Sequence, residues 1–211
     1  MSVGCWRPLY DPQVEPVRRK LGRSYLAGHR LWERARAKTF SVASGPAFAR
    51  FGARSVIQPP VRLTGEAWIS VGDDVFIGSG SWLQVLGSHE DTVIRIGDGT
   101  SIVGNCTLSG AVSITLGKRV LFARNVYIAD HMHRYDDVGT AVLDQGITRL
   151  GAVEIGDGAW LGQNVVVGPN VRIGVGAVIG GNSVVLDDVP DHSVAVGAPA
   201  RVVRTFGDAA T

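Results

Sequence analysis

Two histidines, His131 and His133, lie two positions apart in the segment IADHMHRYDD, residues 128–137. The chain has five histidines in all, and this pair is flanked by carboxylates. Imidazole, with a pKa near ~6.5, accepts a proton at neutral pH and is suited to general-base catalysis. Asp130 and Asp136 are candidates for fixing the tautomer of an imidazole, or they serve as turn residues. The segment therefore indicates proton transfer at a place set by the elements around it.

Those elements follow a six-residue period. From residue 155 an aliphatic side chain recurs at Ile155, Leu161, Val167, Ile173, Ile179 and Val185. Two positions before each later one stand the smaller residues Ala159, Val165, Val171, Ala177 and Ser183. Because side chains alternate along a strand, both sets face inward. The period predicts short strands joined by two-residue turns, with three strands closing a triangular coil of about 18 residues and the coils stacking as parallel strands.

The period breaks at three places, about residues 84–93, 109–115 and 129–152. The histidines stand at the start of the last break, which predicts a loop that leaves the solenoid. Long ordered loops of this kind commonly carry function. Cys106 stands two positions before Leu108, at an inward position, and is expected in the core, while Cys5 has no base partner in the sequence.

The outward positions predict an oligomer. In the unbroken region they are Trp160, Val166, Arg172, Val178 and Val184. Residues one coil apart share a face, so two faces are apolar and the one with Arg172 is polar. Two apolar outer faces do not suit a monomer. We expect a homotrimer, in which each three-sided coil buries two flanks and exposes one.

The N-terminal segment is basic. Residues 1–54 carry 11 Lys and Arg against three Asp and Glu, whereas the full chain has 21 against 19. Residues 16–38 predict a helix with an apolar stripe of Val17, Leu21, Tyr25, Trp32 and Ala35, interrupted by Gly28. Such a helix either caps the open end of the solenoid or rests on anionic lipid. Nucleic-acid binding has only charge in its favour.

Bulk composition fits a large core with many tight turns, because the 211 residues include 28 Gly and are 45% hydrophobic. We expect a basic N-terminal segment at 1–54, a β-helix domain with its C-terminal loop at 55–206, and a tail at 207–211. No secretion signal and no apolar run of about 18 residues is evident, so we expect a cytoplasmic protein, with membrane contact only at its periphery.

The pattern [Ile/Leu/Val]-Gly-x4 resembles the hexapeptide repeat of acyltransferases that fold as left-handed parallel β-helices, over about residues 56–206. The resemblance implies a mainly β fold: a left-handed parallel β-helix with an N-terminal helical segment and an excursion loop. It also implies acetyl transfer from acetyl-CoA to a hydroxyl of a sugar or glycan. A histidine would act as general base in a direct-transfer ternary complex, without a covalent intermediate.

The stretch with the histidines resembles the maltose, galactoside and polysaccharide O-acetyltransferases of that family. Their base lies about seven residues beyond an aliphatic residue that matches Val126, which selects His133, whereas a cruder match of the flanking residues selects His131. The other histidine would orient the loop or the acceptor. Asn105 matches a position that holds the acceptor in this family, although Asn is also common at turns.

The resemblance also implies where coenzyme A binds. AWLGQN is similar to the family strand near the pantetheine, which makes Trp160 and Gln163 cofactor residues together with Gly181. GAPARVVR is similar to the family's terminal loop, in which arginines reach the phosphates; here they are Arg201 and Arg204. Where the family often has Thr-Lys after the last coil, this chain has Leu186 and Asp187, and the acidic residue is expected to weaken coenzyme A binding.

Other classes are weaker alternatives. Within the acyltransferases, the acceptor is also compatible with an antibiotic or with the amino group of a nucleotide-linked sugar. A metal enzyme similar to γ-type carbonic anhydrase would need three converging histidines, and His89 and His192 lie in other segments, so no metal is expected. A non-catalytic solenoid subunit would not need the histidine loop and the terminal arginines.

Overall fold

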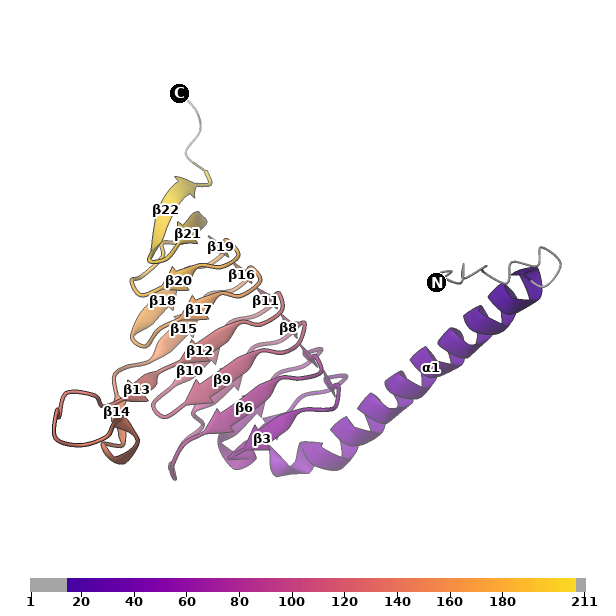
Figure 1. Cartoon of the computed structure of the whole chain (residues 1–211), viewed down its shortest axis with the longest axis horizontal. Helices are drawn as coiled ribbons and strands as arrows, with labels where there is room; N and C mark the ends of the chain where they lie inside the picture. Colours follow the sequence, from indigo (N-terminus) through magenta and orange to yellow (C-terminus); the bar gives the residue numbers. More distant parts are fainter. Residues whose placement is uncertain (1–14, 208–211) are drawn as a thin grey trace, which may run out of the picture.

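The structure, a computed structural model, describes residues 15–207 and is a three-sided solenoid of parallel β-strands with one long helix at its N-terminal end (Figure 1). Sheet A contains β1 (Arg50–Phe51), β4 (Ile69–Val71), β7 (Ile94–Ile96), β10 (Ile114–Leu116), β15 (Val153–Ile155) and β18 (Val171–Ile173). Sheet B contains β2 (Val56–Ile57), β5 (Phe76–Ile77), β8 (Ser101–Ile102), β11 (Leu121–Phe122), β16 (Trp160–Leu161), β19 (Val178–Ile179), β21 (Ser193–Gly197) and β22 (Ala200–Thr205). Sheet C contains β3 (Arg62–Thr64), β6 (Trp82–Val85), β9 (Thr107–Gly110), β12 (Tyr127–Ala129), β17 (Val166–Val167) and β20 (Val184–Val185). The chain visits the three sheets in turn, so each coil adds one strand to each sheet.

The core is the column of inward side chains that the period predicts. Every predicted inward residue from Ile155 to Val185 is at most 2% exposed, and Ser183 is the one polar member. Cys106 is 1% exposed and belongs to the same core, as expected. Phe122 is the largest of its fully buried side chains. The mainly β class and the parallel stacking are therefore confirmed.

The outward side chains form the predicted columns. In sheet B, Leu121 pairs with Trp160 and Trp160 with Val178. In sheet C, Tyr127 pairs with Val166 and Val166 with Val184. In sheet A, Glu154 pairs with Arg172. Two outer faces of the upper coils are thus apolar and one is charged.

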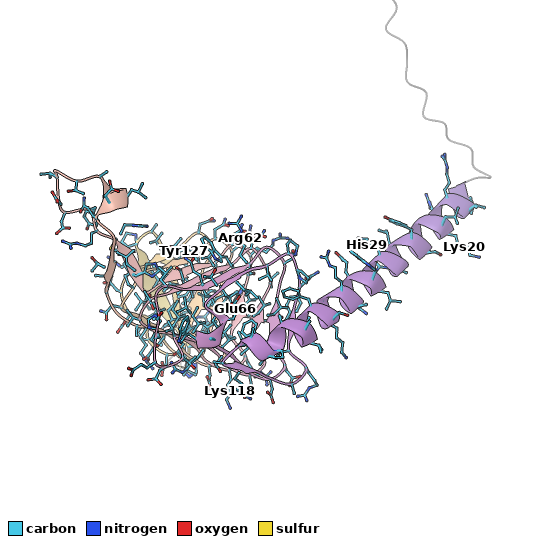
Figure 2. The ribbon with its side chains drawn as sticks, turned by 90° about the horizontal axis from the view of Figure 1, so that it is seen from below. Lys20, His29, Arg62, Glu66, Lys118 and Tyr127 are labelled. Carbon is cyan, nitrogen blue, oxygen red and sulfur yellow. The ribbon has the colours of Figure 1, made fainter. Side chains whose placement is uncertain are left out.

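Helix α1 (Glu15–Ser44) extends beyond the predicted residues 16–38 at its C-terminal end. Only its last turns pack on the solenoid: Ala37 and Ser41 are buried, and Ser41 Oγ accepts the N–H of Ile57 at 2.8 Å. The rest projects away from the body (Figures 1 and 2). A short 3₁₀ turn (Gly45–Ala47) leads into β1, which pairs with β4, so the solenoid begins at Arg50, before the expected boundary at residue 55.

Two segments leave the regular coil. β13 (His131–His133) and β14 (Ile147–Arg149) form an antiparallel pair at the base of the excursion between β12 and β15, with a 3₁₀ turn (Val142–Asp144) in its tip. A third 3₁₀ turn (Glu66–Trp68) precedes β4. At the C-terminal end, β22 folds back antiparallel on β21 and extends sheet B.

Candidate active site

Asp130 anchors the base of the excursion. Its side chain is fully buried, and its carboxylate accepts the backbone N–H groups of Ala111 at 2.7 Å and of Val112 and Ser113 at 2.8 Å each. Its backbone carbonyl accepts the N–H groups of residues 150 and 151, where the excursion returns to the solenoid. One residue therefore fixes the turn between β9 and β10 and both ends of the loop that carries the histidines.

His131 continues from this anchor. Its Nδ1 lies 3.1 Å from Asp130 Oδ1, and its Nε2 lies 3.4 Å from Ser109 Oγ. Gln84 donates to the same hydroxyl, with 2.6 Å between Nε2 and Oγ. A carboxylate that only accepts hydrogen bonds requires the proton on Nδ1, which leaves Nε2 of a neutral ring as the acceptor for Ser109. The ring is 9% exposed and both of its nitrogens have partners, so its tautomer and orientation are set.

His133 differs from His131 in its position on β13 and in its exposure to solvent. It lies at the far end of β13, where its backbone pairs with Ile147, and its side chain is exposed. Asp136, a second candidate for holding an imidazole, instead lies 3.6 Å from the guanidinium of Arg134. Of the two carboxylates proposed to orient a ring, Asp130 does so in this structure and its partner is His131.

The predicted cofactor residues gather elsewhere, along sheet B and the corner where the chain passes from sheet B to sheet C. Trp160 points outward from β16 and is 48% exposed, and Gln163 and Gly181 follow at this corner in successive coils. A Cβ at position 181 would lie 3.2 Å from the carbonyl oxygen of Gln163, so glycine keeps the space between these backbone groups open.

Asn105 occupies the same corner, three coils below Asn182. Its φ of 53° is left-handed, and so are those of Asn125, Asn164 and Asn182. Three of these side chains form a ladder, with Asn125 Nδ2 donating to Asn164 Oδ1 at 3.0 Å and Asn164 Nδ2 to Asn182 Oδ1 at 2.8 Å. The left-handed turn accounts for asparagine at all four positions, since Asn tolerates this conformation better than most residues. Asn105 is exposed and remains a candidate for binding the acceptor.

The terminal arginines lie on β22. Arg201 Nη1 is 3.0 Å from Asp187 Oδ2, so the acidic residue that replaces the family's lysine pairs with the very guanidinium expected to bind a phosphate. The guanidinium of Arg204 lies over the ring of Phe206, 5.1 Å from its centroid. A phosphate that binds Arg201 therefore competes with Asp187 for this guanidinium.

Sheet C separates the histidines from the cofactor residues. Within the fourth coil the chain leaves the B–C corner at Asn125, crosses sheet C as β12 and reaches His131 only at the opposite edge. Extended backbone from Val126 to His131 spans about 16 Å at ~3.3 Å per residue. Figure 1 shows β13 and β14 on one side of the solenoid, with β16 and β19 on the other. A single chain thus does not bring these histidines and the predicted cofactor residues together.

The remaining observations concern Cys106, metal ligands and membrane-spanning helices. Burial raises the pKa of the Cys106 thiol, which suits a core residue and not a nucleophile. Within residues 15–207 no cluster of three or more His, Cys, Asp or Glu side chains is arranged to hold a metal ion. Among the described helices none has the length and apolar character needed to cross a membrane. Cys5 lies outside the described residues.

Sequence reasoning missed Ser109 and Gln84 as members of the site. They stack on each other in sheet C, where Gln84 pairs with Ser109, and both fall at the ends of hexapeptides where the period breaks. Polar residues at the start of the breaks at 84–93 and 109–115 were the available signal.

Residues 152–187 match the sequence profile of the family described as bacterial transferase hexapeptide (six repeats). The putative lipopolysaccharide biosynthesis O-acetyltransferase WbbJ of Escherichia coli is 31% identical over 157 residues, which cover 72% of this chain and 79% of WbbJ. The chain belongs to the hexapeptide-repeat acyltransferase family. Acetyl-CoA is therefore the co-substrate that donates the acyl group. The probable acetyltransferase Rv3034c of Mycobacterium tuberculosis is 33% identical over 65% of this chain, which spans only 42% of that protein.

Solved structures agree with this assignment. Galactoside acetyltransferase in complex with coenzyme A has a TM-score of 0.56 and 27% identity, over 78% of this chain and 68% of that one. A mutant of AntD, an N-acyltransferase from Bacillus cereus, has a TM-score of 0.66 at 20% identity, over 78% of this chain and 88% of that one. The second likeness shows the fold alone.

Proposed function

We propose that the protein transfers an acetyl group from acetyl-CoA to a hydroxyl of a sugar or glycan, with His133 as the general base. The observation that carries the assignment is the contrast between the two imidazoles. His131 has both ring nitrogens engaged and is nearly buried, whereas His133 is exposed at the end of a strand whose base is anchored by Asp130. A base must reach the proton that it removes, and His133 has the access that this requires.

In this mechanism the acceptor hydroxyl attacks the thioester carbonyl carbon while the His133 imidazole takes its proton. The carbon–sulfur bond then breaks, and the imidazolium returns the proton to the departing thiolate of coenzyme A. His131 is a positioning residue, because it links the loop to Ser109 and Asp130 without facing the solvent. Trp160, Gln163 and Gly181 would hold the pantetheine, and Arg201 and Arg204 the phosphates.

The proposal includes a left-handed winding and a homotrimer in which the excursion of one protomer meets the B–C corner of its neighbour. Two observations support the trimer: sheet C separates the two halves of the site within one chain, and the outer columns of sheets B and C are apolar. Buried against a second copy, these columns would no longer expose Leu121 and Tyr127 to water. Light scattering should give about 67 kDa, three times the chain mass of 22.3 kDa.

The test is a thioester-consumption assay with purified protein against a panel of sugars, lipid-linked glycans and amino sugars. His133→Ala should lower turnover at least a hundredfold, because a general base typically contributes about 10²–10⁴-fold. His131→Ala should retain most of the chemistry and lose stability, because it breaks the link between Ser109 and Asp130. Near-normal turnover in His133→Ala, with an inactive but folded His131→Ala, would reverse the two roles. If only amino sugars are turned over, the acceptor group is an amine and the proposed hydroxyl acceptor is wrong.

A further inference from the structure

Helix α1 carries an apolar stripe that no other part of residues 15–207 covers. Its members are Val17, Leu21, Tyr25 and Trp32, which are 59%, 66%, 73% and 55% exposed. Their spacing of four, four and seven residues places them within one narrow sector of the helix. Every residue from Pro16 to Trp32 is exposed, so residues 33–207 do not bury this half of the helix.

The stripe faces away from the side of the helix that packs on the solenoid. Ala37, the first buried residue of α1, stands five positions after Trp32. At 3.6 residues per turn, five positions correspond to about 140° around the axis. Figure 2 shows the segment with Lys20 and His29 standing clear of the solenoid body. The side of α1 that packs on the solenoid is therefore not the side that carries the stripe.

The charge of the same helix selects the partner. Its sequence contains eight Lys and Arg against two Glu, a net charge of +6. Arg18 and Lys20 flank the stripe on either side, at about 100° and 300° when Val17 is set at zero. A second copy of α1 laid against the stripe would bring two such charges together, which is unfavourable. An anionic surface neutralises them while it takes up the apolar side chains.

The aromatic residues agree with an interfacial position. The rings of Tyr25 and Trp32 both contact His29, with centroids 6.4 and 6.1 Å away, and the Arg36 guanidinium lies 4.9 Å from the Trp32 centroid. Tyr and Trp concentrate where one side of the ring is apolar and the other is wet, at the level of lipid head groups. A helix of 30 residues, about 45 Å long, offers a contact line of useful length.

We propose that α1 is a membrane-surface arm, which lies on anionic phospholipid with Val17, Leu21, Tyr25 and Trp32 buried at the boundary between head groups and acyl chains. The arm holds the solenoid at the bilayer as a peripheral protein. The inference is independent of the chemistry assigned to His133, since it depends only on α1.

The test is flotation of the full-length protein with two kinds of vesicle: pure phosphatidylcholine, and equal parts of phosphatidylcholine and phosphatidylglycerol. Binding to the anionic vesicles should exceed binding to the neutral ones roughly tenfold, and high salt should remove most of the difference. Leu21→Glu should lower binding to the anionic vesicles roughly tenfold, because it places a charge at the boundary between head groups and acyl chains.

Leu26→Glu is the matched control, since Leu26 is also exposed but lies about 140° around the helix from Leu21. It makes the same change of charge and should keep binding within about twofold of the unaltered protein. Equal losses in the two variants would overturn the stripe as the contact surface. Equal binding to neutral and anionic vesicles would overturn the choice of an anionic surface. A fall in oligomer mass in Leu21→Glu without vesicles would show that the stripe binds a second copy of the chain. Tighter binding of the protein to nucleic acid than to vesicles would show that α1 binds nucleic acid. Either outcome would refute the proposal.

Discussion

Replacing the Asp130 carboxylate with an amide should weaken the fold and the site together. Oδ2 accepts the N–H groups of Val112 and Ser113, and Oδ1 accepts those of Ala111 and the His131 ring. In Asp130→Asn the amide oxygen can keep two of these bonds, but its NH₂ then faces the N–H of Ala111. A buried N–H without an acceptor costs about 1–3 kcal/mol. The remaining bonds also lose their ionic character, and charge-assisted bonds are roughly twice as strong as neutral ones. We expect the free energy of unfolding to fall by on the order of 3 kcal/mol.

The assay is urea denaturation at fixed protein concentration, followed by fluorescence, with turnover measured on the same samples. The His131 ring must change its tautomer to meet the new NH₂, and the base of the excursion that carries His133 loses part of its anchor. Turnover should therefore fall roughly tenfold while the KM for acetyl-CoA is unchanged. Asp136→Asn is the control, because Asp136 is exposed and its ion pair is with the exposed Arg134. It should change stability by less than about 0.5 kcal/mol. An Asp130→Asn protein with full turnover and a loss below about 1 kcal/mol would refute the anchoring role.

Two further perturbations address the cofactor site and the response to acid. Asp187→Asn releases Arg201 from its ion pair, so calorimetry should show coenzyme A binding roughly threefold to tenfold tighter, whereas weaker binding would mean that Asp187 helps to position the arginine. The pKa of Asp74 is lowered by hydrogen bonds from Arg54, that of Asp98 by the N–H of Asp73, and that of Asp137 by the N–H of Gly139. A carboxylate with a lowered pKa in the folded state stabilises the protein above its unfolded pKa, and this contribution is lost as the pH falls through the folded value. The melting temperature should therefore drop below about pH 4, and Asp74→Asn should make that drop smaller.

Local physics made the solenoid predictable from the sequence. Alternation along each strand sends Ala159 and Leu161 inward and Trp160 outward, and the six-residue period then fixes which residues stack. The structure has these pairings, such as Trp160 over Leu121 and below Val178. Gly and Asn at the corners mark the turns, because the left-handed conformation at Asn164 and Asn182 disfavours most other residues.

The site was less predictable, because its contacts join residues far apart in the chain. Asp130 meets Ala111 across 19 positions and His131 meets Ser109 across 22, in segments where the period is broken. Without the period there is no register, so no rule identifies the neighbours of a residue. The sequence predicted both histidines and Asp130 as candidates. It did not predict which imidazole forms a hydrogen bond with the Asp130 carboxylate. The pairing of Asp187 with Arg201 depends in the same way on how β22 folds back.

The geometry of sheet C gives the apolar columns a role in the proposed catalysis as well as in assembly. Tyr127 stands on β12, between the corner that carries Asn125 and the edge that carries Asp130, so any surface that covers it lies between the two halves of the site. If a neighbouring protomer covers this column, the same contact that removes Tyr127 and Val166 from water also brings a second B–C corner toward the excursion. Tyr127→Glu, on a side chain that is 44% exposed in the single chain, should then dissociate the oligomer and abolish turnover in one step. Full turnover in a monomeric variant would show that one chain forms the whole site, and would overturn the composite arrangement.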